Sequence, residues 1–172
     1  MKKVITLLFL VSFGFINAQK AFTGKGDTRV NVGANLQDGG SGIQGSVDFG
    51  LGENFSFGFV ANYLLGADDR NIFVNNQIQT RTPDFGDRFD AKARINANLS
   101  SVIGVEQLDI YPGLSLGLRN FGGHVGGRYF FTDGFGVFTE IGFPIAKYSN
   151  DNGVFDHLNN QATFSLGASF NL

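Results

Sequence analysis

The segment 161–172 alternates strictly between apolar and polar or small residues, and this pattern constrains the fold more than any other stretch. Its apolar positions are Ala162, Phe164, Leu166, Ala168, Phe170 and Leu172. A helix would repeat its apolar residues every three or four positions, so the pattern predicts a β-strand with one apolar face. An open soluble sheet rarely leaves such an edge bare, because an unpaired strand promotes aggregation. We therefore expect the segment to close a barrel whose outer face contacts lipid.

The composition fits a chain built from such strands. The 172 residues allow one domain of ordinary size and include 25 glycines and 20 phenylalanines, yet the mean hydropathy is only +0.01. Alternation explains the near-zero mean hydropathy, because each apolar residue is offset by a polar neighbour whose side chain points to the other face. The net charge of -2 indicates no nucleic-acid partner. The absence of cysteine excludes a disulfide framework, a cysteine-based metal site and a lipoprotein anchor.

The first eighteen residues have the pattern of a secretory signal. Lys2 and Lys3 precede an apolar run over 4–15, and Ala18 provides a small residue for cleavage. The run is shorter than the roughly 20 residues that a spanning helix needs. We expect residues 1–18 to be a cleaved signal peptide and 19–172 to be the mature domain; an uncleaved anchor is the alternative.

Alternation recurs along the rest of the chain and predicts an all-β fold. Eight strands are expected, over 29–37, 43–51, 55–63, 89–99, 108–118, 121–131, 135–147 and 161–172. An even number of strands with short turns at one end and longer loops at the other is typical of an antiparallel up-and-down transmembrane β-barrel. The last strand should then pair with 29–37, and both termini should be periplasmic. Pro112 and Pro144 weaken the assignment unless they lie at bulges, and a soluble secreted β-sandwich is the alternative architecture.

Strand parity also predicts the connections. Leu51 should pair with Phe55 and Phe131 with Phe135, which leaves two three-residue loops with Asn54 and Gly134 in the left-handed conformation. The segment 66–87 should be a long polar loop at the outer side. Its apolar trio, Ile72, Phe73 and Val74, is a possible contact site for an extracellular partner or surface.

Outward aromatic residues are predicted near both rims of the barrel, as expected for the girdles of a membrane barrel. Those near the periplasmic rim are Phe55, Phe131, Phe135 and Phe170, and those near the other rim are Tyr63, Phe89, Phe121 and Phe164.

The inward positions collect charges of both signs. They are Arg29, Asp48, Asp90, Lys92, Arg94, Asp109, Arg119, Arg128 and Glu140. Side chains fill an eight-stranded barrel, so these charges should pair with one another. The specific pairs predicted are Asp90 with Arg119, and Arg128 with Glu140. A salt-bridged plug is expected; a narrow or gated polar path is the alternative.

Several stretches resemble the small outer-membrane β-barrel family of the OmpA transmembrane domain and OmpX type. They are L-D-I-Y-P-G-L-S-L-G-L, G-G-R-Y-F-F-T-D-G-F-G-V-F-T-E-I-G and the terminal F-S-L-G-A-S-F-N-L. The resemblance implies recognition of the last strand by the outer-membrane assembly machinery, although family members usually end in an aromatic residue and this sequence ends in Leu172. It also implies the outer membrane of a Gram-negative bacterium, with membrane lipid as a partner.

No motif indicates catalysis or a cofactor. Outer-membrane enzymes that act on lipid A use a histidine with a serine and an acid, but no serine lies two residues after His124, and its side chain should face inward. His124 and His157 alone do not make a metal site. We expect a non-enzymatic protein with a structural or surface-interaction role. A small passive channel is the second possibility and a lipid-modifying enzyme the third.

Overall fold

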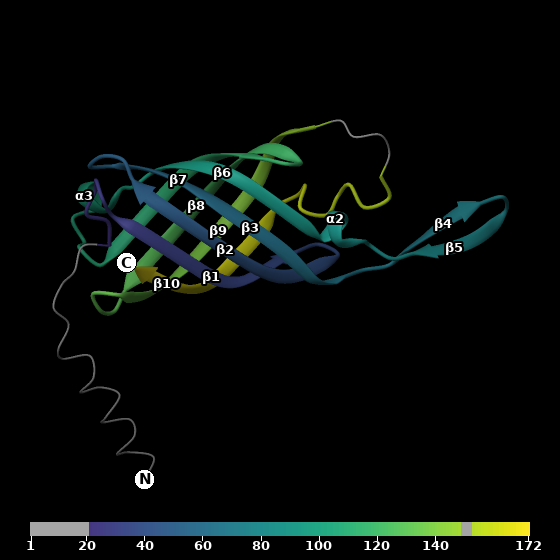
Figure 1. The fold of residues 1–172 in the computed structure, drawn as a ribbon, viewed down its shortest axis with the longest axis horizontal. Helices are drawn as coiled ribbons and strands as arrows, with labels where there is room; N and C mark the ends of the chain where they lie inside the picture. The colour runs from purple at the N-terminus through teal and green to yellow at the C-terminus, as the bar shows by residue number, and fades with distance from the viewer. Residues whose placement is uncertain (1–20, 149–152) are drawn as a thin grey trace, which may run out of the picture.

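Eight antiparallel strands form a closed barrel in the computed structural model, which describes residues 21–148 and 153–172 (Figure 1). The predicted signal peptide, residues 1–18, lies outside the described residues. Around the barrel the strands follow the order β1-β10-β9-β8-β7-β6-β3-β2. Their bounds are β1 Thr28–Gln37, β2 Gly40–Gly50, β3 Phe55–Ala67, β6 Phe89–Ala97, β7 Leu108–Gly117, β8 Asn120–Phe130, β9 Phe135–Lys147 and β10 Thr163–Asn171.

The first and last strands close the barrel. β10 pairs antiparallel with β1 in a register that runs from Arg29 opposite Asn171 to Gln37 opposite Thr163. The predicted pairing of the terminal strand is therefore confirmed. A single closed sheet also rules out the two-sheet sandwich considered from the sequence.

The two turns predicted from parity pair as expected, but their backbone differs from the prediction. The amides of Leu51 and Phe131 donate to the carbonyls of Phe55 and Phe135, respectively. Neither Asn54 nor Gly134 has a positive φ, so the predicted left-handed conformation is wrong. In each turn the accepting carbonyl also takes a second bond from the following amide, which closes the loop without a left-handed residue.

The connection over 66–87 is more ordered than a polar loop. β3 continues to Ala67, and a separate hairpin of β4 (Arg70–Val74) and β5 (Gln77–Arg81) projects from one end of the barrel (Figure 1). Asn75 and Asn76 join its strands with φ of 49° and 65°, the conformation of a two-residue turn that matches strand twist. The short helix α2 (Phe85–Arg88) then leads into β6.

The two barrel prolines lie where ladder pairing is interrupted. Pro112 is the residue next to Gly113, where the described pairing of β6 with β7 ends. Pro144 pairs with Gly122 beside the register shift between Phe121 and Gly122. A missing amide costs little at such points, so both prolines are compatible with barrel strands. A short helix, α3 (Ser100–Ile103), follows β6.

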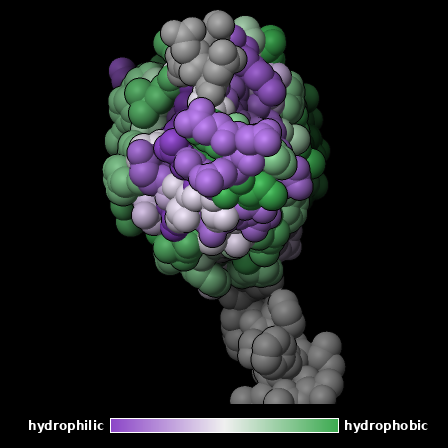
Figure 2. Space-filling model, turned by 90° about the vertical axis from the view of Figure 1, so that its right-hand side faces the viewer, coloured by the Kyte–Doolittle hydropathy of each residue, from purple (hydrophilic) through white to green (hydrophobic). Residues whose placement is uncertain are grey.

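The distribution of polarity is inverted relative to a soluble protein. Among the described residues, 24 buried residues are polar or charged and only 9 are hydrophobic, while 30 large hydrophobic residues are exposed. Figure 2, which views the molecule from the hairpin end, shows hydrophilic residues at the front and hydrophobic residues around the sides. None of the helices in the described segments is long and apolar enough to cross a membrane.

Candidate functional site

The barrel interior, here called the lumen, is organised around Arg94 on β6. Its Nε and Nη2 donate to the two carboxylate oxygens of Asp48 on β2, both at 2.7 Å. Its Nη1 donates to Glu140 Oε2 on β9 at 2.8 Å. All three groups are buried. The arginine fork therefore ties three strands together, with the bidentate geometry that makes arginine–carboxylate pairs strong.

A second arginine reaches the same carboxylate from the opposite wall. β8 and β2 lie four strands apart in either direction around the barrel, and Arg128 Nη2 on β8 donates to Asp48 Oδ2. The guanidinium also lies 3.6 Å from Asp109 Oδ2 and 4.0 Å from the centre of the Tyr111 ring. Tyr111 fits beside Gly126, because a Cβ there would lie 2.2 Å from the tyrosine ring.

Arg29 forms a separate ion pair nearer the end of the barrel that carries the two three-residue turns, here called the turn end. Its Nη2 donates to Asp27 Oδ2 at 2.7 Å, and its guanidinium stacks 4.8 Å from the centre of the Phe130 ring. Both charged side chains are buried. Asp27 was missed because it precedes the predicted first strand, although its two-residue spacing from Arg29 places both on one strand face.

Both predicted charge pairs are wrong. Asp90 faces Lys92 at 3.5 Å, whereas Arg119 lies at the rim and donates to the carbonyl of Gly86. Arg128 pairs with Asp48 and Asp109, and Glu140 pairs with Arg94. The physical reasons differ: Arg128 crosses the narrow lumen to Asp48 instead of following one wall, and Arg119 lies in the connection after β7, where it reaches the backbone of Gly86. The other predicted network members, apart from Arg119, do lie inside the barrel.

Neutral polar side chains fill the remaining space between the charges. Asn96 donates to Asp48 Oδ1 at 3.1 Å and to Ser56 Oγ at 3.0 Å. Gln44 donates to Glu140 Oε1 at 3.3 Å and accepts from Ser165 at 2.7 Å. A cavity bordered by Arg94 and Glu140 has a volume of only about 30 Å³, room for about one water.

The hairpin end of the lumen is covered by residues 154–160. Phe155 and Leu158 pack against Leu64 of β3 in a buried apolar cluster. Asn120 of β8 donates to the backbone carbonyl of Asn159 at 3.2 Å. The connection before the last strand thus contains an apolar anchor; its residues 149–152 lie outside the described part of the chain.

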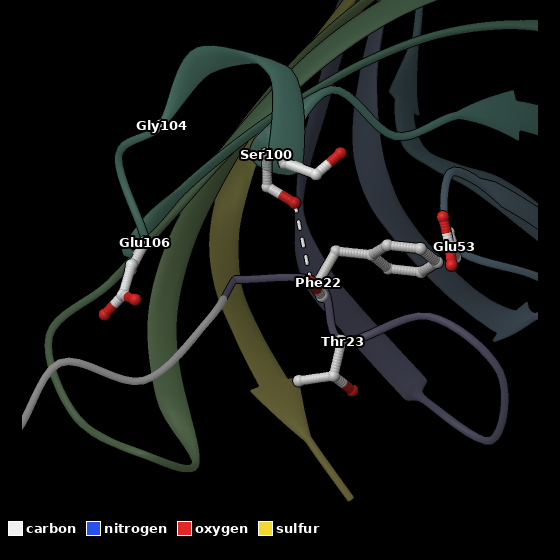
Figure 3. Close-up of a pocket in the computed structure, with 7 residues that line it drawn as sticks. Phe22, Thr23, Glu53, Ser100, Gly104 and Glu106 are labelled. Carbon is white, nitrogen blue, oxygen red and sulfur yellow. Dashed lines mark hydrogen bonds between the residues drawn. The ribbon is translucent and has the colours of Figure 1, made fainter.

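Residues 21–27 cover the turn end. Ala21 and Phe22 are buried, and the amide of Ala21 donates to the carbonyl of Glu106. Figure 3 shows Ser100 donating to the carbonyl of Phe22 beside a pocket of about 390 Å³. Glu53 and Glu106 line this pocket from separate loops. No cluster of three potential metal-ligating side chains occurs in segments 21–148 and 153–172.

The two histidines have different surroundings. His124 is buried in the lumen, where its Nε2 donates to Asn96 Oδ1 at 2.7 Å. His157 lies in the covering segment and accepts from Arg70 Nη2 at 3.3 Å. The pKa of His157 is lowered below its ordinary value. Partial burial is the larger cause, and the positive charge of Arg70 is the second. Within 21–148 and 153–172, no hydrogen bond joins either histidine to a serine, as a serine–histidine hydrolytic centre would require.

The predicted girdle residues lie on the outward face. At the turn end, the ring centres of Phe135 and Phe170 are 5.7 Å apart, and those of Phe131 and Phe135 are 6.5 Å apart. At the hairpin end, Tyr63 and Phe89 lie 5.4 Å and 5.6 Å from Phe85 of α2. Phe55 completes the girdle at the turn end, and Phe121 and Phe164 complete the girdle at the hairpin end.

Sequence comparison assigns the chain to a family. Residues 11–172 match the family of unknown function DUF6646, and the chain belongs to that family. Neither the comparison with curated proteins nor the comparison with solved structures gives a match.

Proposed function

We propose that the protein is a non-enzymatic outer-membrane β-barrel with a structural or surface-interaction role. The observation that carries the proposal is the inverted barrel, in which buried charges fill the lumen and large apolar side chains cover the outside. In water such an exterior would be an aggregation hazard, whereas lipid favours it. The termini would lie in the periplasm, and the longer connections would face outward.

The lumen favours a static role over a passive channel. Arg94, Asp48 and Arg128 bridge opposite walls, and segments 21–27 and 154–160 cover the two ends. A conducting path would require these contacts to break together. An enzyme acting on membrane lipid is also less favoured, because His124 faces the lumen and donates to Asn96.

The first experiment is membrane fractionation followed by heated and unheated gel electrophoresis. We expect the protein to require detergent for extraction and to change mobility on heating, because a folded barrel resists the detergent. A detergent-free soluble form with one mobility would contradict the membrane proposal. The purified barrel should then be silent in planar bilayers; conductance steps altered by Glu140→Ala would support the channel instead.

The projecting hairpin is the strongest candidate for the surface-interaction role. Phe73 and Ile78 pair across β4 and β5 and are 77% and 63% exposed. An exposed apolar pair on a projecting element is typical of a contact site. Ile72 and Val74 occupy the hairpin's less exposed face, so only Phe73 of the predicted trio is strongly exposed.

The test of the hairpin compares cells that display the wild-type protein with cells that display the Phe73→Ser/Ile78→Ser double variant. We expect the double variant to insert normally but to reduce cell–cell or cell–surface adhesion. Unchanged adhesion with equal surface display would rule out this contact role.

A further inference from the structure

The outward face of β2, β3, β6 and β7 contains an apolar depression of about 710 Å³. Small residues from three neighbouring strands make its floor, since Gly45 lies opposite Ala61 and Ala61 lies opposite Ala91. Phe59 and Leu116 rise beside this floor. The barrel wall is therefore thinner here, because the floor positions carry only hydrogen or methyl side chains.

A second depression of about 210 Å³ continues the first. The two share Ala93 and Leu116, and the second extends toward Phe57 and Phe121. Both are lined largely by apolar side chains on the exterior of the barrel. Together they form one surface, here called the lipid groove, whose lining residues come mainly from β2, β3, β6, β7 and β8.

Two arginines lie at the hairpin end of the lipid groove. Arg119 directly follows Leu118, which lines the groove, and Arg88 directly precedes β6. Arg119 donates to the carbonyl of Gly86, and Arg88 donates to the carbonyls of Pro83 and Leu65 at 3.1 Å and 3.4 Å. Both guanidinium groups therefore gather around the same short segment before β6.

The positive charge of these arginines is not neutralised by a close carboxylate. Within 21–148 and 153–172, no carboxylate oxygen lies within 4.0 Å of either guanidinium. The nearby acids have other partners. Asp84 and Asp87 accept from each other's backbone amides, and Asp90 faces Lys92.

We propose that the lipid groove binds one anionic lipid of the surrounding membrane, with its acyl chain over Gly45 and Ala61 and its phosphate at Arg88 and Arg119. This inference rests on the proposed membrane location. The arginine fork suits phosphate oxygens, and apolar small residues leave space for a hydrocarbon chain. The combination of a hollow apolar floor and unneutralised cations at one end matches a lipid with one charged end.

The test uses the full mature chain refolded in a neutral detergent, with phosphatidylglycerol as the probe and phosphatidylcholine as the uncharged comparison. Retained lipid is counted by native mass spectrometry. We expect the wild type to retain one phosphatidylglycerol in preference to phosphatidylcholine. The Arg88→Gln/Arg119→Gln variant should bind phosphatidylglycerol about tenfold more weakly, because it loses charge-assisted contacts.

The chain offers a matched pair of variants for the groove floor. An added Cβ meets nothing within 4 Å at Gly45 or at Gly127, which lies on β8, on the opposite side of the barrel. Gly45→Phe should abolish retention by filling the groove, whereas Gly127→Phe should leave it unchanged. Both variants should keep the heat-modifiable mobility of the folded barrel.

Four results would overturn the lipid proposal. The first two are equal retention by the two phenylalanine variants and equal retention of the two lipids by the wild type. The third is a dimer lost only in Gly45→Phe, which would identify a second copy as the occupant. The fourth is displacement of the lipid by inorganic phosphate alone, which would identify a simple anion site. A chain that is soluble without detergent contradicts the membrane location itself, so the two failures are distinguishable.

Discussion

Removing the Asp48 carboxylate should destabilise the barrel strongly, because this one group serves two buried arginines. Arg94 donates to both of its oxygens at 2.7 Å, Arg128 donates to Oδ2, and Asn96 donates to Oδ1 at 3.1 Å. Removing one partner of a buried ion pair costs about 3–5 kcal/mol, because the charge that remains is buried and uncompensated. We expect Asp48→Ala to lower the free energy of unfolding by about that amount.

The control for Asp48 is Glu140→Gln. Glu140 accepts from a single arginine, and glutamine keeps the shape of the side chain. The variant should therefore lower the free energy of unfolding by about 1.5–3 kcal/mol, the range for one hydrogen bond to a charged group. Urea unfolding of the barrel in detergent, followed by circular dichroism and gel mobility, measures both variants. Adding Arg128→Met to Asp48→Ala should recover part of the stability, because it removes one of the two buried arginine charges that lose Asp48.

A loss of less than about 1 kcal/mol in the free energy of unfolding of Asp48→Ala, the range of an exposed ion pair, would refute the role of this carboxylate. The same role would be refuted if the free-energy losses of the single variants Arg128→Met and Asp48→Ala simply added in the double variant. Additive losses would mean that the two side chains do not depend on each other.

Two further predictions concern packing and pH. Gly126→Ala should destabilise the barrel by about 1–3 kcal/mol, because its methyl group would overlap the Tyr111 ring; Gly127→Ala, which meets no atom, should change stability little, and equal losses in urea unfolding would contradict this account. Because the pKa of His157 is lowered when its segment is docked, the stability of docking is complete above the ordinary histidine pKa of 6.5 and is lost as the pH falls through the lowered value. The hydrogen-exchange protection factors over 153–160 should therefore fall as the pH drops below 6.5, less so in Arg70→Gln, which should raise the pKa of His157; a fall that is equal in the two proteins would refute the role of Arg70.

Alternation predicted the strands and their faces because each barrel wall separates a polar interior from an apolar exterior. Phe164, Leu166 and Phe170 illustrate this, since all three lie on the exposed face of β10. Parity also located the turn between Leu51 and Phe55, because directly opposed residues share a face. It could not determine the φ of Asn54, which depends on how two amides share one carbonyl.

The pairs inside the lumen could not be predicted in the same way. Parity shows that Arg128 and Asp48 both point inward, but it does not show that β8 and β2 face each other at the same depth. That relation depends on strand tilt and stagger around the closed barrel. The sequence suggested the neighbouring Glu140 for Arg128, whereas the side chain spans the lumen.

The hairpin and the covering segment were missed for local reasons. The strands β4 and β5 are short and neither of their faces is fully buried, so they lack the strict alternation of a buried face; Asn75-Asn76 was the available turn signal. Phe155 and Leu158, three residues apart in a polar stretch, were the available signal for an apolar anchor.

The arrangement of bonds inside the barrel bears on where its function can lie. Opening the lumen would separate Arg94 and Arg128 from Asp48 and leave this carboxylate without an arginine partner in a narrow interior. The cost of that state is far larger than the thermal energy, so the wall and its filling behave as one rigid unit. Variation in response to the surroundings is then confined to the outside of this unit. The projecting hairpin and the lipid groove are two exterior features with exposed apolar surface. In the groove this surface ends beside Arg88 and Arg119, and on the hairpin it lies beside Arg70 and Arg81. We therefore expect the protein to act through its exterior, and the Gly45→Phe and Phe73→Ser/Ile78→Ser variants separate the two surfaces without disturbing the lumen.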